Sequence, residues 1–156
     1  MSNKIVVLGG DGFCGWPVAL RLSKEGNRVT IVDNLSRRGI DGILSSNSIT
    51  PIRTIEERLE KWNSINDVPI NFINIDLSKN RTKLENVFYE INPDTIVHFA
   101  EQRAAPYSMR NDDTNESLII GRSVTEWEVR RAMSSFPVEI GKSSSFLWSY
   151  RKLRYD

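Results

Sequence analysis

Near its amino terminus the chain reads Ile5-Val6-Val7-Leu8-Gly9-Gly10-Asp11-Gly12-Phe13-Cys14-Gly15-Trp16. An apolar run rich in β-branched residues ends in a cluster of glycines, which predicts a strand, a tight turn and the start of a helix. The glycines follow two overlapping spacings, Gly10-x-Gly12-x-x-Gly15 and Gly9-x-x-Gly12-x-x-Gly15. Such a turn lets the backbone approach a pyrophosphate at a helix N-terminus, where unpaired N–H groups stabilise an anion. The stretch therefore predicts a dinucleotide site, with a plain structural turn as the alternative.

An acidic residue supports the dinucleotide interpretation. A second apolar strand over 28–33 ends at Asp33, 24 residues after Gly9, where an acid is expected to meet an adenosine ribose. A carboxylate there accepts hydrogen bonds from both ribose hydroxyls and repels a 2′-phosphate, which favours NAD over NADP. Arg37 and Arg38 follow closely and offer a phosphate two cations, so NADP stays open as the alternative.

The bulk composition narrows the class of protein. A chain of 156 residues, 39% hydrophobic and 26% charged, is the size of one globular domain with a real core. No apolar run approaches the roughly 20 residues of a membrane helix, and a net charge of +1 gives no reason to expect nucleic acid. The first strand begins almost at once, so we expect no signal or transit peptide. The single cysteine, Cys14, excludes an internal disulfide and suits a cytoplasmic protein, and we expect it to pack rather than to react.

The rest of the body alternates strands and helices. The predicted elements after the first strand are a helix over 16–25, a strand over 28–33, a long loop over 34–50, a helix over 54–62, a strand over 69–76, a helix over 82–91 and a strand over 94–100. Thr54 and Glu57 have the spacing of a capping box. This order predicts an α/β fold with a Rossmann-like, doubly wound parallel sheet. Ligands of such sheets bind beyond the carboxyl ends of the strands, where the glycine turn, Asp33, Asp76 and the segment after Ala100 fall.

Several strings carry a resemblance to the extended short-chain dehydrogenases, the NAD-dependent epimerase/dehydratase family. The glycine turn, Asp76-Leu77 and Val97-His98-Phe99-Ala100 have the family's pattern. Within the family the chain most resembles the UDP-sulfoquinovose synthase group. The strings that carry this closer resemblance are 9–16, Asp33-Asn34-Leu35-Ser36-Arg37-Arg38, Ser48-Ile49-Thr50-Pro51-Ile52 and His98-Phe99-Ala100-Glu101-Gln102-Arg103-Ala104-Ala105-Pro106-Tyr107-Ser108-Met109.

The resemblance implies a cofactor, substrates and site residues. The cofactor would be a bound NAD, the substrates UDP-glucose and sulfite, and the full-length family allows a homodimer; no metal, nucleic acid or membrane is implied. Asp11 and Gly12 would lie on the pyrophosphate, and Arg103 where the nicotinamide meets the sugar. The cofactor-binding positions by resemblance are Gly9, Asp11, Gly12, Phe13, Cys14, Gly15, Asp33, Asn34, Leu35, Arg37, Asp76, Leu77, Phe99, Ala100 and Arg103, and the substrate-binding positions are Gln102 and Arg103. The alternative for Arg103 is a surface ion pair with Glu101 or Asp112.

The resemblance ends at about Asp112. The family continues to a Tyr-x-x-x-Lys pair in which the Tyr accepts a sugar hydroxyl proton. This chain has no such pair: Tyr89, Tyr107 and Tyr150 are followed four residues on by Pro93, Asn111 and Arg154. We therefore divide the chain into an NAD-binding domain over 1–112 and a divergent segment over 113–156, out of frame or unrelated, and assign no catalytic residue.

The divergent segment has consequences for fold and activity. A helix over 114–134 is predicted, residues 143–156 have no convincing periodicity, and a sheet incomplete at its C-terminal side would leave a strand edge and apolar surface exposed. The chain as written is expected to be inactive. The alternatives are a non-catalytic NAD-binding fragment and another NAD-dependent nucleotide-sugar epimerase or dehydratase.

Overall fold

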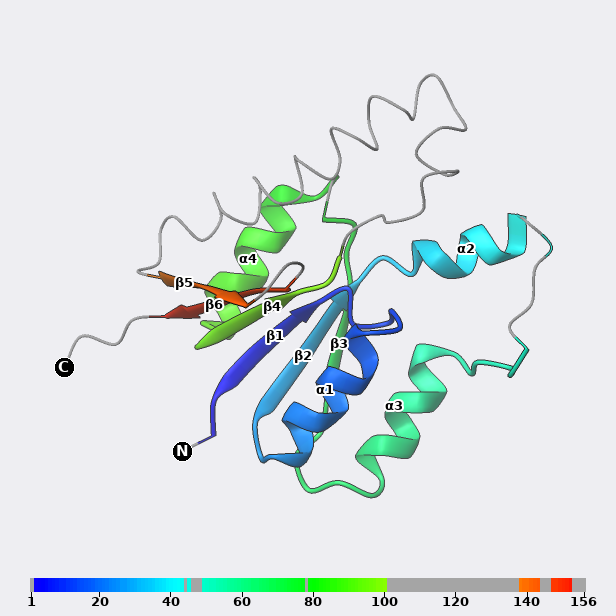
Figure 1. Ribbon diagram of the computed structural model, residues 1–156, viewed down its shortest axis with the longest axis horizontal. Helices are drawn as coiled ribbons and strands as arrows, with labels where there is room; N and C mark the ends of the chain where they lie inside the picture. Colours follow the sequence, from blue (N-terminus) through cyan, green and yellow to red (C-terminus); the bar gives the residue numbers. More distant parts are fainter. Residues whose placement is uncertain are drawn as a thin grey trace.

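The described part of the chain forms one sheet with helices on both faces (Figure 1). The computed structural model describes residues 2–43, 45, 49–77, 79–100, 138–143 and 147–152. The strands are β1 (Lys4–Leu8), β2 (Arg28–Asp33), β3 (Asn71–Asn74), β4 (Thr95–His98), β5 (Val138–Ser143) and β6 (Leu147–Lys152). The helices are α1 (Gly15–Lys24), α2 (Ser36–Ile43), α3 (Ile55–Asn63) and α4 (Arg81–Ile91).

The strand order confirms the predicted Rossmann-like sheet. The order is β3-β2-β1-β4-β6-β5, and the first four strands are parallel. Ile5 of β1 is in register with Val29 of β2 on one side and with Thr95 of β4 on the other. The first strand of the sequence is therefore an inner strand, with its carboxyl end between those of β2 and β4.

Two predictions about the C-terminal part need correction. β6 pairs with β4 in antiparallel orientation, and β5 pairs with β6, so the edge of β4 that was expected to be open is occupied. β6 also lies in the stretch where no periodicity was found. A segment that pairs with the edge of an existing sheet forms backbone hydrogen bonds there, so it can become a strand without an alternating side-chain pattern. The helix predicted over 114–134 lies outside the described residues.

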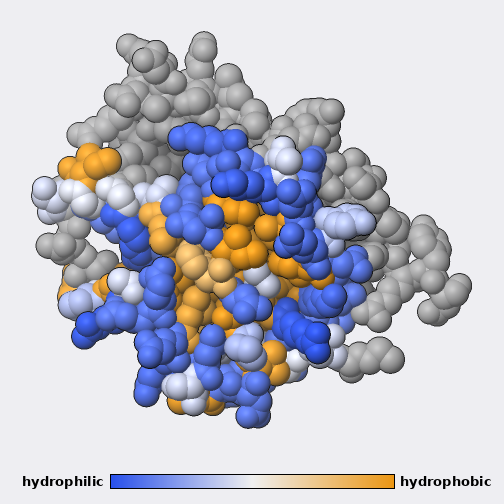
Figure 2. Space-filling view, turned by 180° about the vertical axis from the view of Figure 1, so that it is seen from behind, coloured by the Kyte–Doolittle hydropathy of each residue, from blue (hydrophilic) through white to orange (hydrophobic). Residues whose placement is uncertain are grey.

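The side chains of β1 divide the core into two layers. Val6 and Leu8 face a cluster completed by α4, which contributes Leu84, Val87 and Phe88. The residues between them, Ile5 and Val7, face the second cluster, built with residues of α1 and α3. Alternation along a strand buried on both faces produces these two layers. Figure 2 shows apolar residues gathered at the centre of the side turned away in Figure 1, ringed by hydrophilic ones.

The ends of the helices follow local signals in the sequence. α1 ends before Gly26, whose φ of +86° is favourable only for glycine. α3 begins with the predicted capping box, in which Thr54 accepts a hydrogen bond from Glu57 N and the Glu57 carboxylate accepts one from Thr54 N. α4 ends at Ile91, and its C-cap residue, Asn92, is left-handed with φ +48° and precedes Pro93.

The prediction of a continuous loop over 34–50 is wrong, because α2 occupies Ser36–Ile43. The two glycines in this helix disfavour it by about 1 kcal/mol each, which is why the composition suggested a loop. Contacts outside the helix offset that cost. The Asn34 Oδ1 atom accepts a hydrogen bond from Ser36 N at 3.0 Å, and Arg38 in the first turn is paired with a buried carboxylate described below.

Ser23 of α1 forms a hydrogen bond with α3. Its hydroxyl is buried, donates to Val68 O at 2.8 Å and accepts from Trp62 Nε1 at 3.1 Å. α3 is thereby held beside α1, which matters for the site because α3 contributes a residue to it. Within the described ranges, none of the helices is long and apolar enough to cross a membrane.

Candidate functional site

The glycine turn lies at the carboxyl edge of the sheet, between the ends of β2 and β4. Gly9 N donates to Val32 O at 2.8 Å, and Phe99 N donates to Leu8 O at 2.8 Å. The chain leaving β1 is thus bonded to both neighbouring strands at the place where ligands of such sheets bind.

Three of the four glycines in the turn are required by the protein's own packing. A Cβ on Gly9, whose φ is +76°, would lie 2.6 Å from Ala100 N, and a Cβ on Gly10 would lie 2.5 Å from Ile31 Cγ2. A Cβ on Gly15 would collide with the backbone of the turn itself. At Gly12 the Cβ would meet only Gly9 O at 3.2 Å. Gly12 is therefore the position where the backbone presents an open side to a ligand.

The N-terminus of α1 beside Gly12 has no side-chain cap. Cys14 at the N-cap makes no side-chain hydrogen bond to the helix, and the first turn of α1 has no acidic residue. The first N–H groups of a helix have no intrahelical partner and carry a partial positive charge. Phe13 and Cys14 are exposed, so Cys14 is not packed as predicted. The turn offers an anion donors with no competing side chain.

Asp11 points into the protein and binds two arginines. Its side chain is 3% exposed; Arg38 Nε lies 2.9 Å from Oδ2, and an Nη atom of Arg58 contacts Oδ1. The Arg38 contact is an ion pair without hydrogen-bond alignment, so the buried Oδ2 accepts no aligned hydrogen bond from the described residues. The two arginines and one carboxylate sum to +2 − 1 = +1. A carboxylate in a phosphate-binding turn would repel the ligand, and this pairing removes the repulsion.

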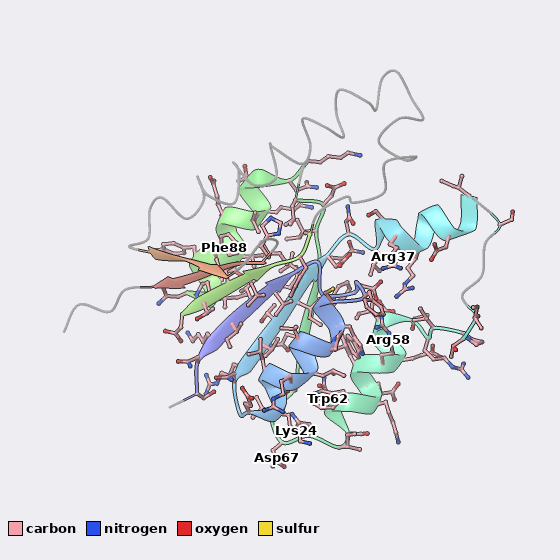
Figure 3. The ribbon with its side chains drawn as sticks, in the orientation of Figure 1. Lys24, Arg37, Arg58, Trp62, Asp67 and Phe88 are labelled. Atoms are coloured by element: carbon pink, nitrogen blue, oxygen red, sulfur yellow. The ribbon has the colours of Figure 1, made fainter. Side chains whose placement is uncertain are left out.

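Arg58 is held from three sides. Its guanidinium lies 4.3 Å from the centre of the Trp16 ring, and its Nε donates to Arg53 O at 3.1 Å. Figure 3 shows Arg58 on the side of α3 that faces α1, with Arg37 on α2. Sequence reasoning missed Arg58, because its pairing with Asp11 spans 47 residues; the capping box located α3 but not the contact.

The Asp33 carboxylate accepts hydrogen bonds from two backbone amides of the site. Oδ2 accepts from Asp11 N at 3.0 Å and Oδ1 from Leu35 N at 2.8 Å. Burial raises the pKa of this carboxyl above its ordinary 3.8, and the two backbone hydrogen bonds partly oppose the rise. Each carboxylate oxygen has a second lone pair, so a ribose hydroxyl can still bind. Leu35 is left-handed, with φ +56°, and packs against the core on the α1 side.

Of the residues predicted to bind the adenosine, some are exposed and others are buried. Asn34 and Arg37 are exposed, and Arg37 has no ion-pair partner among the described residues, whereas Arg38 is engaged by Asp11. Asp76 is half-buried, and its carbonyl oxygen accepts from Asn80 N at 3.0 Å. Leu77 is a core residue, so its side chain is not on the surface of the site.

The structure brings most of the predicted residues to one edge. Phe99 and Ala100 are half-buried beyond the end of β4 and lie against the glycine turn. Gln102 and Arg103 lie outside the described residues. A shallow groove of about 260 Å³ beside the turn has none of the predicted residues in its lining, which consists of Trp16, Arg53, Glu57, Arg58, Lys61, Trp62 and Ile65.

Sequence comparison supports this architecture. The chain is 45% identical over 123 residues to the chloroplastic UDP-sulfoquinovose synthase of Spinacia oleracea, a match that covers 76% of this chain and 25% of that protein. It is 39% identical over 130 residues to the UDP-sulfoquinovose synthase of Sulfolobus acidocaldarius, covering 83% of this chain and 33% of that protein. The chain thus spans a quarter to a third of the length of these relatives.

Solved structures share the fold. A UDP-glucose 4-epimerase from Bifidobacterium longum, determined with NAD+ and UDP, matches 85% of this chain and 33% of its own chain with a TM-score of 0.62 and 23% identity. The UDP-Glc/GlcNAc 4-epimerase of Campylobacter jejuni matches 86% of this chain and 34% of its own, with a TM-score of 0.63 and 20% identity.

The sequence model described as "NAD dependent epimerase/dehydratase family" matches residues 5–136, which includes all the predicted site residues. The chain belongs to the NAD-dependent epimerase/dehydratase family.

Proposed function

We propose that the carboxyl edge of β1, β2 and β4 binds NAD, and that the chain is the cofactor-binding part of an enzyme that converts UDP-glucose and sulfite to UDP-sulfoquinovose. The observation that carries the cofactor half is the glycine turn, with an open side at Gly12, an uncapped α1 and Asp33 at its flank. The identity of 39–45% with two UDP-sulfoquinovose synthases supports the substrate half.

The diphosphate and the adenosine half of the cofactor have chemical partners in the site. The diphosphate fits the backbone amides at the start of α1, beside a side-chain cluster of charge +1. The adenosine ribose fits the carboxylate of Asp33, which also disfavours a 2′-phosphate. Asp76 follows β3 and would border the adenine, and Leu77, whose side chain is in the core, could do so only through its backbone. These residues bind and orient the cofactor; the chemistry that NAD supplies when bound is the removal and later return of a hydride.

The sugar half of the site is assigned by resemblance alone. Gln102 and Arg103 would contact UDP-glucose or sulfite, since a guanidinium binds an oxyanion with paired hydrogen bonds. The sequence has no Tyr-x-x-x-Lys pair to take the proton of the sugar hydroxyl. We therefore assign turnover to a longer protein that contains this pair, and NAD binding to this chain.

Titration of the full chain with NAD, followed by tryptophan fluorescence, tests the cofactor half. Trp16 lies one residue past Gly15 and stacks with Arg58, so binding at the turn is expected to change its emission. Asp33→Ala should weaken NAD at least tenfold, because the ribose loses its acceptor and Asp11 N loses a partner. Arg28→Gln, at the opposite end of β2, is the matched control and should bind as the wild type does. Saturable binding that Asp33→Ala leaves unchanged would contradict the proposed site.

A second titration separates NAD from NADP. The wild type should prefer NAD, and Asp33→Ala should narrow the preference because it removes the charge that repels the 2′-phosphate. Tighter binding of NADP by the wild type would assign the cofactor differently and give Arg37 the role of phosphate ligand.

Mass spectrometry after incubation with UDP-glucose, sulfite and NAD tests the catalytic half. We expect no sulfonated sugar nucleotide from this chain. Its appearance would refute the assignment of turnover to a longer protein. The second candidate is an ordinary nucleotide-sugar epimerase, favoured by 30% identity over 122 residues to a UDP-arabinose 4-epimerase of Arabidopsis thaliana. A longer protein that epimerises its substrate without using sulfite would support that candidate.

A further inference from the structure

The two strands that flank β1, β2 and β4, each end in a residue whose side chain accepts a hydrogen bond from the backbone amide two residues on. At the end of β2, the side chain of Asp33 accepts a hydrogen bond from the amide two residues on, Leu35 N, at 2.8 Å. At the end of β4, His98 Nδ1 accepts one from Ala100 N at 3.1 Å. A bond from a side chain to the backbone two residues on fixes the direction in which the chain leaves the strand. Asp33 and His98 therefore occupy equivalent places on either side of the glycine turn.

The segment that His98 fixes is in backbone contact with the turn. A Cβ built on Gly9 would lie 2.6 Å from Ala100 N and 2.7 Å from the Phe99 carbonyl carbon. Phe99 N is in turn bonded to Leu8 O at 2.8 Å. With backbone against backbone and no side chain between them, a shift of Ala100 must move Gly9 or open a gap beside it.

The chemical state of the imidazole follows from its role as an acceptor. Nδ1 receives a hydrogen bond, so it is unprotonated and the neutral ring has its proton on Nε2. His98 is 4% exposed and lies on the same face of β4 as Ile96, toward α4. Ala100 is half-buried, so an amide that lost this acceptor would need another partner, and an unpaired N–H costs free energy.

We propose that His98 is a positioning residue of the dinucleotide site, which holds the Phe99–Ala100 backbone against Gly9 through the hydrogen bond from Ala100 N to Nδ1. The inference rests on the proposed binding of NAD. His98 acts through the backbone of the turn and does not contact the cofactor. An acceptor at the Nδ1 position is the required feature, and an aromatic ring is not.

Two substitutions separate the acceptor from the ring. His98→Asn places its Oδ1 atom near the position of Nδ1 and should keep the NAD dissociation constant within about twofold of the wild type. His98→Leu has no acceptor and should weaken NAD about tenfold. Thr95→Val, at the other end of β4, is the control and should not change the affinity. If His98→Leu fails to fold by circular dichroism, His98→Gln takes its place, since its longer side chain puts the acceptor near the Nε2 position.

Amide hydrogen exchange of Ala100, measured by NMR on the full chain, tests the hydrogen bond without cofactor. Exchange should be slow in the wild type and in His98→Asn, and at least tenfold faster in His98→Leu or His98→Gln. Equal exchange in all variants, or an equal loss of NAD affinity in His98→Asn and His98→Leu, would overturn the inference. A wild type that does not bind NAD would instead overturn the proposed function, and the exchange rates would still report on the bond.

Discussion

Replacing Gly9 with alanine adds one methyl group at the point where the turn meets the chain leaving β4. Two costs arise. The φ of +76° is left-handed, which disfavours a residue with a Cβ by about 1–2 kcal/mol. The methyl group would also lie 2.6 Å from Ala100 N, a backbone atom that cannot rotate away, and forcing a group into a packed site costs about 1–3 kcal/mol. We expect Gly9→Ala to lower the free energy of unfolding by about 2–5 kcal/mol, the sum of these two costs.

Gly26 provides a matched control for the backbone strain. Its φ is +86°, but nothing lies within 4 Å of a Cβ built there. Gly26→Ala should therefore lose only the strain, about 1–2 kcal/mol. The difference between the two variants, about 1–3 kcal/mol, isolates the collision with the β4 exit.

Urea denaturation of the full chain, followed by far-UV circular dichroism, measures both variants. The dependence of the free energy on urea should be the same for each, so that the difference reflects the folded state. If Gly9→Ala and Gly26→Ala agree within about 0.5 kcal/mol, the close approach of Ala100 to Gly9 is not as described. The argument that the turn and the β4 exit move together would then fail as well.

Three further variants test the site and its support. Asp11→Asn leaves Arg58 without its buried partner charge and should lower the free energy of unfolding by about 3–5 kcal/mol. Arg21→Gln, which breaks an exposed pair, should change it by less than about 0.5 kcal/mol. If urea denaturation gave equal losses of free energy for both variants, burial of the Asp11 pair would not explain its strength. The pKa of Asp33 is raised by burial, so the folded state keeps this proton to higher pH than the unfolded state does. The wild type should therefore lose stability relative to Asp33→Asn as pH rises from 3.8 through the raised pKa. Urea curves measured over about pH 3.5–6 check this. If the stability difference between the two proteins changed with pH in the opposite direction, the hydrogen bonds to Asp33 would outweigh burial. Thr54→Ala removes the capping box of α3 and should cost about 1 kcal/mol by thermal unfolding, with Thr54→Ser near the wild type; no difference between the two would mean that the cap contributes nothing.

Local signals in the sequence predicted most of the elements. The capping box at Thr54 and the Asn92-Pro93 stop are read from neighbours three residues apart or fewer, and both are present in the structure. The strand that ends at Asp33 was predicted with its bounds, because a buried parallel strand is apolar along its whole length.

Contacts between distant residues could not be predicted in the same way. α2 contains two glycines and is held partly by the pairing of Arg38 with Asp11, which no window of neighbouring residues contains. Arg58 lies in a helix that was predicted, yet its partner is 47 residues away. The pairing of β6 with β4 is set by backbone groups, which are the same for every sequence. The sequence therefore locates a predicted turn and acid more readily than the side chains that hold them.

The inner position of β1 has a consequence for synthesis on the ribosome. β1 is the first strand to be translated, but its partner β4 follows much later, since 90 residues separate Lys4 from the Asp94 carboxylate that its amide bonds. At about 5–20 residues per second, translation of that interval takes about 5–20 s. During this time the β4-facing edge of Val6, Val7 and Leu8, all fully buried in the finished sheet, has no partner. The nascent chain should thus be a client of the chaperones that wait at the tunnel exit until β4 emerges.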